Sequence, residues 1–466
     1  MENNFNGLVE SPKGIFYAQD FNLEDVNIIA DTGQVFKLRN LVMELSFFED
    51  IYTFVTSGYV ILKDALGIIE KLKMDGNEFI EIKYGKYKGQ KKEAINQRKY
   101  RIYKVGDRKP DGNLNTEYYK VYFCTEALLL SEQTKISKSY AGKKIATANP
   151  NNSGIINNIL NEYLKVESNK IQTIEETYGV YDFVVPRLKP LEAISWLSTY
   201  ARPNGNKIGA DMLFFETNDG FYFRSLQSMF KDKPYATYKY QPKNLTLNNN
   251  EVIENVISVL DYEFIKTFDA LEGTSAGTYA NRLISVDPLL RSYKVTDYSY
   301  EKFSGSNHLN GYNIMAPARN RLGVRQTEAY DGSLKVVISN SNQSQAPYIR
   351  EKQGSVAKDI FIETYVPFRS AQLSLANYTV LKVTIPGDST ITAGRTIIFN
   401  LFSLQIGESR KLDEFYSGKY LVTAVRHIIQ SQGVYQTVLE LAKESSKTAY
   451  NSPDYGSVNY REAIKQ

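Results

Sequence analysis

Few side chains in this sequence have the chemistry of a catalytic or metal-binding group. The 466 residues contain two histidines, His308 and His427, and one cysteine, Cys124. Neither histidine stands at a ligand spacing such as HExxH, and no pattern indicates the carboxylates that a histidine metal site would need. A nucleophilic pair would have to join Cys124, within the apolar stretch YYKVYFCTEALLL, to one of the histidines. We therefore predict no catalytic residue, no metal and no cofactor.

His427 has a structural explanation. Residues 417–441, SGKYLVTAVRHIIQSQGVYQTVLEL, predict two strands joined by a turn. Side chains two residues apart share a face of a strand, so Leu421, Thr423, Val425 and His427 lie on one side. We interpret His427 as one more position of that strand and not as a catalytic group.

Residues 387–396, GDSTITAGRT, resemble a phosphate-binding loop only in part. Six residues instead of four separate Gly387 from Gly394, and Arg395 stands where that loop requires lysine. The stretch is better interpreted as a turn between two strands. GxSxG is absent, and no spacing singles out a pair of carboxylates among the 52 acidic residues.

The composition is that of an ordinary globular protein, with 42% hydrophobic and 23% charged residues. The length favours about three domains. A net charge of +4 from 56 basic and 52 acidic residues is too balanced for a nucleic-acid-binding protein. One local exception, residues 83–104, has nine basic residues against the single acid Glu93. We interpret this run as a solvated loop, with contact to an acidic partner or to nucleic acid as the alternative.

Localisation signals are weak. No apolar run approaches the roughly 18 residues of a membrane-spanning helix, and the first residues do not have the pattern of a signal peptide. The sequence therefore predicts no membrane span. A single cysteine fits assembly in a reducing cytoplasm.

The first part of the chain alternates with period two, which predicts strands. A hairpin is expected around the turn DTG, with Leu41, Met43, Leu45 and Phe47 on one face, followed by the strands SGYVILKDA and NEFIEIKY. Asp64 is placed to cap a short helix. Residues 1–130 are thus expected to form an antiparallel, barrel-like domain with one small helix.

The middle of the chain changes to helical spacing after Ser153 and again from Pro190, and it contains a hairpin around TNDG. This predicts a mixed α+β domain over 131–248. Residues 249–445 return to strands, with an irregular insertion at about 297–365, a helix PFRSAQLSLAN that has Pro367 in its first turn, and a strand YTVLKVTIPGD. Residues 446–466 form a polar tail expected to order only on a partner.

Two stretches near opposite ends of the chain repeat one another. TSGYVILKDA at 56–65 and YSGKYLVTAV at 416–425 both place Ser-Gly before an alternating strand. In chain order, the sequence resembles the baseplate hub proteins of contractile-tailed bacteriophages and related injection systems. The motifs that carry this resemblance are FFEDIYTFVTSGYVILKDALGIIEKLKMDGNEFIEIKY, PLEAISWLSTYARP, FYFRSL, YTVLKVTIPGDSTITAGRTIIFNL and SGKYLVTAVRHII.

The resemblance implies an α+β, mainly β, fold with two tube-like antiparallel β-barrel domains and inserted mixed domains. It implies a homotrimer in which three chains imitate six tube subunits. Such a ring is a symmetry adapter between the hexameric tail tube and the trimeric central spike, in contact with other baseplate proteins. DNA would pass through its lumen without sequence-specific binding, in the baseplate of a virion assembled in the host cytoplasm. No enzymatic activity is implied.

The 35 tyrosines suit half-buried strands and interfaces. Tyr59, Ile61, Tyr420 and Val422, in the two repeated stretches, are the candidates for partner contacts, although alternation fits barrel core equally well. Two other functions stay open: a tail-tip cell-wall hydrolase, and the equivalent hub of a phage-like secretion system. Nucleic-acid binding rests only on residues 83–104, and weak or absent binding is expected.

Overall fold

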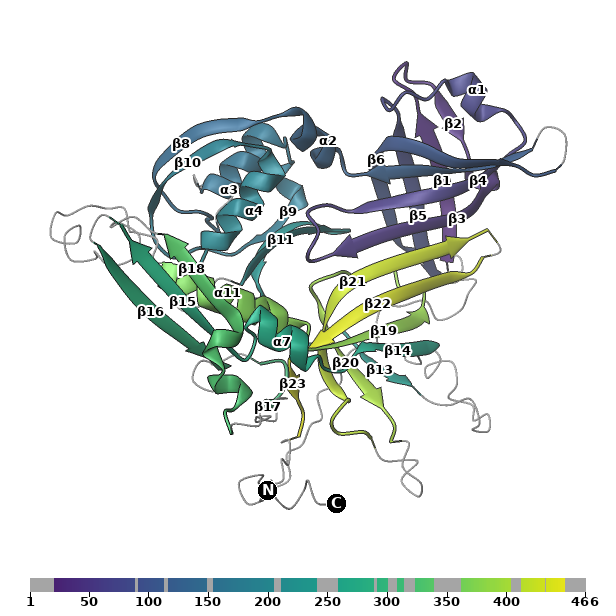
Figure 1. Ribbon diagram of the computed structural model, residues 1–466. Helices are drawn as coiled ribbons and strands as arrows, with labels where there is room; N and C mark the ends of the chain where they lie inside the picture. Colours follow the sequence, from purple (N-terminus) through teal and green to yellow (C-terminus); the bar gives the residue numbers. More distant parts are fainter. Residues whose placement is uncertain are drawn as a thin grey trace.

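The structure is a computed structural model, drawn in Figure 1. It describes residues 21–88, 91–112, 116–148, 154–204, 211–240, 259–288, 291–300, 308–313, 323–338, 362–403, 412–431 and 433–448. The fold is mainly β, with large antiparallel sheets and a smaller helical part, which confirms the predicted fold class. Within the described ranges, no helix combines the length and the apolar character needed to cross a membrane.

The first β domain contains one short helix, as predicted. Its elements are β1 (Phe21–Ile29), β2 (Val35–Lys37), a 3-10 turn (Arg39–Leu41), β3 (Val42–Asp50), β4 (Ser57–Asp64), α1 (Ile68–Leu72), β5 (Phe79–Lys88), β6 (Lys91–Pro110) and β7 (Glu117–Cys124). The strands follow the order β3-β4-β7-β6-β5-β1-β2 and curve around an apolar core. Asp64 accepts hydrogen bonds from the backbone N–H groups of Leu66 and Ile68, both at 2.7 Å, so it lies at the start of α1 as expected, although the N-cap position itself is Gly67.

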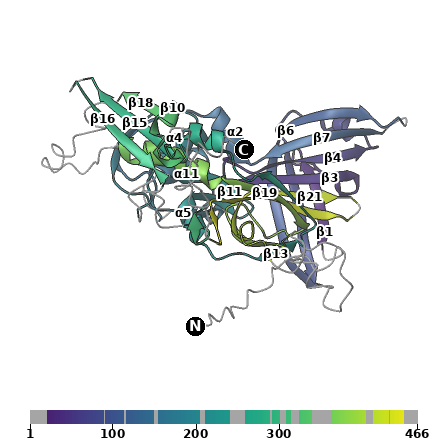
Figure 2. The same ribbon diagram turned by 60° about the horizontal axis from the view of Figure 1, so that its bottom comes forward.

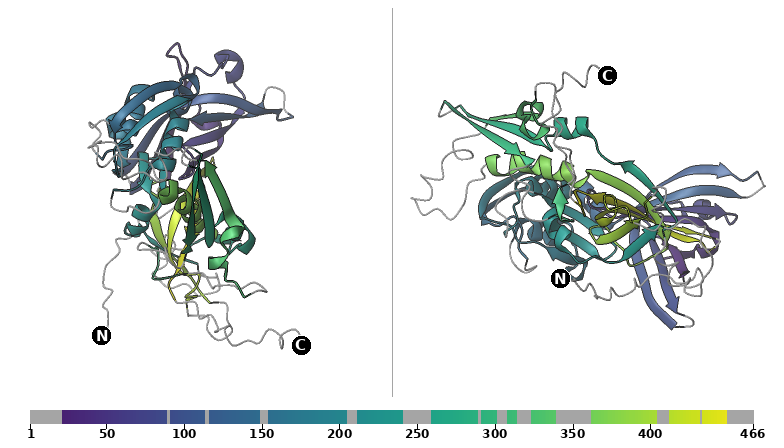
Figure 3. Two further views of the ribbon diagram at one scale, coloured as in Figure 1. Left: turned by 60° about the vertical axis from the view of Figure 1, so that its left-hand side comes forward. Right: turned by 90° about the horizontal axis from the view of Figure 1, so that it is seen from below.

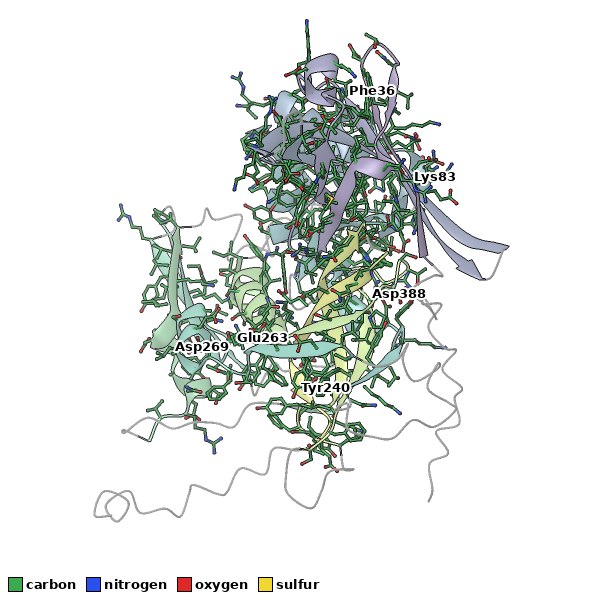
Figure 4. The ribbon with its side chains drawn as sticks, turned by 90° about the vertical axis from the view of Figure 1, so that its right-hand side faces the viewer. Phe36, Lys83, Tyr240, Glu263, Asp269 and Asp388 are labelled. Carbon is green, nitrogen blue, oxygen red and sulfur yellow. The ribbon has the colours of Figure 1, made fainter. Side chains whose placement is uncertain are left out.

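Two expectations for this domain were wrong in detail. The hairpin around DTG forms, but the register of β3 against β4 shifts between Val42 and Glu44, so Met43 is exposed while Leu45 and Phe47 are buried. The basic run 83–104 is not a loop: it belongs to β5 and β6, which pair from Phe79 with Arg101 to Lys88 with Lys91. Figure 4 shows Lys83 where this hairpin leaves the body of the protein.

The middle part of the chain is a mixed α+β unit. Its elements are α2 (Glu126–Gln133), β8 (Ile136–Lys143), α3 (Ile155–Asn158), a π-helical turn (Ile159–Tyr163), a 3-10 turn (Ser168–Lys170), β9 (Ile171–Ile174), β10 (Tyr181–Leu188), α4 (Pro190–Tyr200), β11 (Met212–Thr217) and β12 (Gly220–Ser225). Every β11 side chain is buried, because Met212 and Phe214 face the core of this unit while Leu213 and Phe215 face the next one.

The second β domain is joined to the first in one sheet. Its elements are α5 (Leu226–Lys231), β13 (Thr237–Tyr240), β14 (Asp261–Lys266), β19 (Thr379–Pro386), β20 (Thr396–Leu401), β21 (Gly418–Gln430) and β22 (Tyr435–Lys443). Leu381, Val383 and Ile385 point into its core, as expected. Strand β13 pairs with β20, so the chain enters this domain before residue 249, where the sequence placed the boundary. Strand β21 pairs with β3, from Ala424 with Asp50 to Gln430 with Glu44.

A separate sheet packs on the side of the molecule, next to α11 (Figure 3). Its strands, in the order β16-β15-β18, are β15 (Ala280–Asp287), β16 (Ser292–Ser299) and β18 (Leu334–Ile338). Around it lie α7 (Ala270–Ala276), two 3-10 turns (Gln326–Glu328 and Tyr330–Ser333), α11 (Ile362–Ala376) and the short pair β17 (Tyr312–Asn313) and β23 (Ser445–Ser446). Most of the predicted irregular insertion, and the tail after residue 448, lie outside the described residues.

Two expectations for the last third of the chain were wrong. Helix α11 begins at Ile362, so Pro367 lies inside it and not in its first turn. The helix extends because Ile362 and Tyr365 pack against Leu283 in a small apolar cluster, which outweighs the local cost of proline. The predicted polar tail is also ordered at its start, since Ser445 and Ser446 are buried and pair with β17.

Candidate functional site

The two β domains share one continuous face of the long sheet. From β14 to β6 the strand order is β14-β19-β22-β21-β3-β4-β7-β6, and every neighbouring pair is antiparallel. One side of these strands covers the two β-domain cores. The opposite side, here called the open face, crosses both domains without interruption; Figure 2 shows β6, β7, β4, β3 and β21 in sequence.

A row of aromatic rings crosses the open face. Phe48 on β3 lies 5.9 Å from Tyr59 on β4, ring centroid to ring centroid, and Tyr59 lies 6.2 Å from Tyr122 on β7. Tyr103 on β6 continues the row, 6.2 Å from Tyr122. Cross-strand aromatic pairs of this kind stabilise a sheet and leave one side of each ring available for contact.

Cations stand over these rings and are paired with carboxylates. Arg426 of β21 lies 5.4 Å from the Phe48 ring and donates to the Tyr59 hydroxyl at 2.9 Å, while Tyr59 donates to Glu44 at 2.7 Å. Lys120 lies 5.3 Å from the Tyr59 ring and 3.1 Å from the Asp107 carboxylate. Lys104 of β6 adds a further cation 5.1 Å from the Tyr122 ring, so the face is both aromatic and charged.

The open face ends beside the middle unit in an apolar groove of about 660 Å³. Its lining comes from both β domains and from α2. The side chains include Phe48, Tyr52, Phe54, Val55, Tyr103, Leu128, Ile265, Lys382 and Glu440. The groove runs across the strands, so it is a feature of the joined sheet and not of either domain alone.

The four residues predicted to contact a partner lie in two different environments. Tyr59 and Ile61 are half-buried and lie on the open face. Tyr420 and Val422 are completely enclosed in the core of the second β domain, between β20 and β22. Their side chains therefore have no surface to offer a partner in this chain, and the proposal of a partner contact now rests on Tyr59 and Ile61.

Two buried glutamates hold the three units together at the end of the open face. Glu49 of β3 accepts a hydrogen bond of 2.5 Å from the N–H of Asn218, which lies in the β11–β12 turn. It accepts a second, of 3.0 Å, from the N–H of Ala393 in the loop before β20. Glu216 of β11 accepts from the N–H of Thr56 at 2.9 Å and the hydroxyl of Thr125 at 2.6 Å, both in the first β domain.

Burial dominates the ionisation of these two glutamates. Loss of hydration raises the pKa of Glu49 to about 8 and that of Glu216 to about 7, although their hydrogen bonds oppose the shift. Neither residue was singled out from the sequence. The available signal was the alternation of β3, which places Glu49 on the inward side after Leu45 and Phe47.

Three side chains could in principle do chemistry: His427, Cys124 and His308. Each is buried in the fold or held by a neighbouring side chain. His427 is buried on the core side of β21, where its Nδ1 lies 2.9 Å from the Tyr435 hydroxyl, and burial lowers its pKa to about 4. Burial raises the pKa of the Cys124 thiol to about 12, so the thiolate is disfavoured. His308 contacts Glu444 at 2.8 Å. Residues 387–396 connect β19 to β20 as expected.

Metal ligands do not gather at any of these places. Within the part of the chain that the structure describes, no group of three or more histidine, cysteine, aspartate or glutamate side chains is arranged to hold a metal ion.

Comparison with solved structures finds the same fold in other proteins. The chain has the fold of the tail protein from Neisseria meningitidis MC58, with a TM-score of 0.50 at 9% identity over 90% of this chain and 96% of that one. The 43 kDa tail protein of prophage MuSo2 from Shewanella oneidensis aligns with a TM-score of 0.47 at 7% identity, over 90% and 98% of the two chains.

In sequence, the chain is similar to the "Probable baseplate hub protein gp334" of Vibrio phage KVP40. The two are 23% identical over 421 residues, which is 88% of this chain and 91% of the relative. No protein family profile matches the chain. The resemblance to baseplate hub proteins that the motifs indicated is confirmed by this relative and by the tail-protein fold.

Proposed function

We propose that the protein is the hub of a phage baseplate: a trimeric adapter that joins the hexameric tail tube to the trimeric central spike and lines the channel for DNA. The observation that carries this proposal is the pairing of β21 with β3, which fuses two β domains into one sheet with a common open face. Three copies would then present six β domains, which is the number a hexameric tube requires.

The edges of the sheet support closure into a ring. Among the described residues, β14 pairs only with β19, and β6 beyond Ile102 pairs only with β7, so each end has an unpaired edge. Because neighbouring strands between these ends all alternate in direction, β14 and β6 run in opposite directions. Under rotational symmetry, β14 of one copy would therefore meet β6 of the next in antiparallel pairing, and no edge would stay exposed.

Such a hub functions through the fixed arrangement of its domains and not through catalysis. The buried glutamate junction fixes the two β domains and the middle unit relative to one another, so one chain can transmit the force of sheath contraction without a hinge. The surroundings of His308, His427 and Cys124 favour this reading over a tail-tip hydrolase. Clearing of bacterial cell wall in a zymogram would support the hydrolase. The same hub in a phage-like secretion system remains the second candidate, and its neighbouring genes would identify it.

Native mass spectrometry of the purified chain tests the ring. The wild-type protein is expected to be a trimer, and a monomer at high concentration in the presence of the spike would overturn the proposal. The N–H of Gly387 donates to Tyr435 on β22, so by alternation Lys382 of β19 points to β14 and bonds its partner Glu263, and the N–H of Tyr262 points to the free edge. Tyr262→Pro removes that donor and is expected to give monomers. Tyr262→Ala, which makes the same loss of the ring but keeps the N–H, is the matched control and should stay trimeric.

A further inference from the structure

The three-stranded sheet β16-β15-β18 turns its more apolar side outward. On the side that faces α11, β15 presents Asn281, Leu283 and Ser285, of which only Leu283 is apolar. On the open side, two rows of apolar side chains, here called the apolar rows, cross all three strands. They are Ile284 with Val295 and Val336, and Val286 with Tyr293 and Ile338. A sheet with one covered side normally covers the more apolar one, so another surface is needed to explain the apolar rows.

The apolar rows are well exposed in a single chain. Tyr293 and Ile338 are 72% and 73% exposed, and Val336 is 61% exposed. The next row is polar at two of its positions, because Arg282 lies opposite Asp297 there and pairs with it at 2.7 Å. An apolar patch with a charged rim is the pattern of a surface on which another protein docks.

We propose that the apolar rows are an interface between copies of this chain: in the trimer they dock on the middle unit of the neighbouring copy. The inference rests on the proposed function, because closure of the ring is what brings a second copy to this place. It assigns part of the contact between copies to a sheet that does not belong to either β domain.

Chain connectivity ties the three-stranded sheet to one edge of the long sheet. Its residues are inserted between β14, which ends at Lys266, and β19, which begins at Thr379. Within the described ranges, β14 is an edge strand of the second β domain. The three-stranded sheet therefore branches off at the strand that would meet the next copy.

The middle unit is tied to the opposite edge region. It follows β7, which ends at Cys124 and pairs with β6. Because neighbouring strands alternate in direction from β14 to β7, these two strands run the same way and their C-terminal ends lie at the same end of the long sheet. Figure 1 shows both insertions at that end, the middle unit above and the three-stranded sheet below. When β14 of one copy pairs with β6 of the next, the three-stranded sheet of the first meets the middle unit of the second.

Pairing of the two edge strands alone is too small for a permanent ring. Strand β14 has six residues, so its pairing covers about 20 Å by 10 Å, or roughly 200 Å² on each copy. A stable interface buries roughly 800 Å² on each partner. The apolar rows supply further area beside this edge, and closed symmetry covers them in every copy at once.

The middle unit has a surface that suits the apolar rows. On the outer side of β10, Val184 is 67% exposed and lies opposite Ser139 of β8, while Pro186 lies opposite Ser137. The serine side chains are small, so a valine and a proline stand out from a low surface. Large side chains such as Tyr293 and Ile338 can approach such a surface closely.

The test places positive charge on the apolar rows. The double variant Val336→Lys, Ile338→Lys changes side chains that are exposed in a single chain, so the monomer is expected to fold normally. The matched control is Val35→Lys, Leu66→Lys, which adds the same charge at side chains that are 51% and 57% exposed. These control positions lie by β2 and α1, at the far end of the first β domain (Figure 1).

Sedimentation over a dilution series measures the protein concentration at which half of the chains are trimeric. The double variant is expected to need at least about tenfold more protein than the wild type, while the control matches the wild type. Val184→Lys, on the receiving side, is expected to shift this concentration in the same direction, and no shift would overturn the assignment to the middle unit. A double variant as trimeric as the control would overturn the inference, and loss of spike binding by that trimer would assign the apolar rows to the spike.

Failure of the ring and failure of this interface give different results. A wild-type protein that stays monomeric at high concentration with the spike present overturns the proposed function. A trimeric wild type together with a trimeric double variant overturns the interface alone. If circular dichroism shows that the double variant is unfolded, Ile338→Lys with Val35→Lys as its control repeats the comparison, and equal trimer formation by these two again counts against the interface.

Discussion

Two sheets of this protein each have one covered side and one open side, yet their open sides differ. On the long sheet, the open face has tyrosines and paired charges. On the three-stranded sheet β16-β15-β18, the covered side packs on α11 through Leu283, while the open side presents Tyr293, Val336 and Ile338, which are 72%, 61% and 73% exposed. Side chains alternate between the two faces of a strand, so the residue types on the open side are independent of those in the core.

The two open sides differ in how much apolar side-chain surface they expose to water. Ile284 of β15 pairs with Val295 on one side and Val336 on the other, and Val286 pairs with Tyr293 and Ile338. These two apolar rows are costly in water, whereas the long sheet's open face can stay hydrated. Arg282 interrupts the apolar surface, and it is held by Asp297 and Asp331.

The largest effect of a single substitution is expected on the covered side of the three-stranded sheet. Leu283→Ala removes a fully buried side chain and should lower the free energy of unfolding by about 3 kcal/mol. Leu334→Ala makes the same chemical change at a side chain that is 50% exposed on the open side, and should cost under about 1 kcal/mol. Denaturant unfolding of both variants measures the difference, and equal losses would show that both sides are covered in solution.

A second prediction compares the carboxylates buried at the junction with those on the open face. Glu49 and Glu216 have pKa values raised by burial, so the folded chain keeps protons that the unfolded chain has lost above about pH 4.5. The free energy of unfolding should therefore fall as pH rises from about 5 to 8, by up to about 1.4 kcal/mol per pH unit for each group, and then level off. Denaturant unfolding at several pH values measures this slope.

The open face should respond in the opposite direction. Hydrogen bonds from Lys120 and Lys63 lower the pKa of Asp107 and Asp111, so their contribution is present above the ordinary value of 3.8 and is lost as pH falls below it. The double variant Glu49→Gln, Glu216→Gln should abolish the fall in the free energy of unfolding between pH 5 and 8. It should leave unchanged the loss of stability below about pH 3.8, which comes from the carboxylates of the open face. A slope that survives in this variant would contradict the assignment.

The smallest effect is expected from a single ion pair of the open face. Lys63→Met breaks the pair with Asp111 and should leave the free energy of unfolding nearly unchanged, since water screens an ion pair whose side chains are both accessible. Thermal unfolding at low and high salt measures it. A loss of several kcal/mol would mean that the pair is a structural element, and the comparison between hydrated and covered faces would need revision.

Local patterns predicted much of this fold. The hairpin at DTG, the strands SGYVILKDA and YTVLKVTIPGD, the helix from Pro190 and the hairpin at TNDG all formed as expected, because each depends on neighbours within a few residues. The errors fell where distant contacts override local preference. Met43 is turned out by a bulge, and α11 continues through Pro367 because of packing on Leu283.

The sequence by itself determined which residues lie in strands, which side chains share a face, and a resemblance to hub proteins. Only the tertiary structure decided that β3 and β21 join, that Tyr59 lies on an open face while Tyr420 is enclosed, and that Glu49 and Glu216 bridge three units. The physical reason is separation along the chain: a strand's alternation is local, but which of its two faces is covered depends on partners hundreds of residues away.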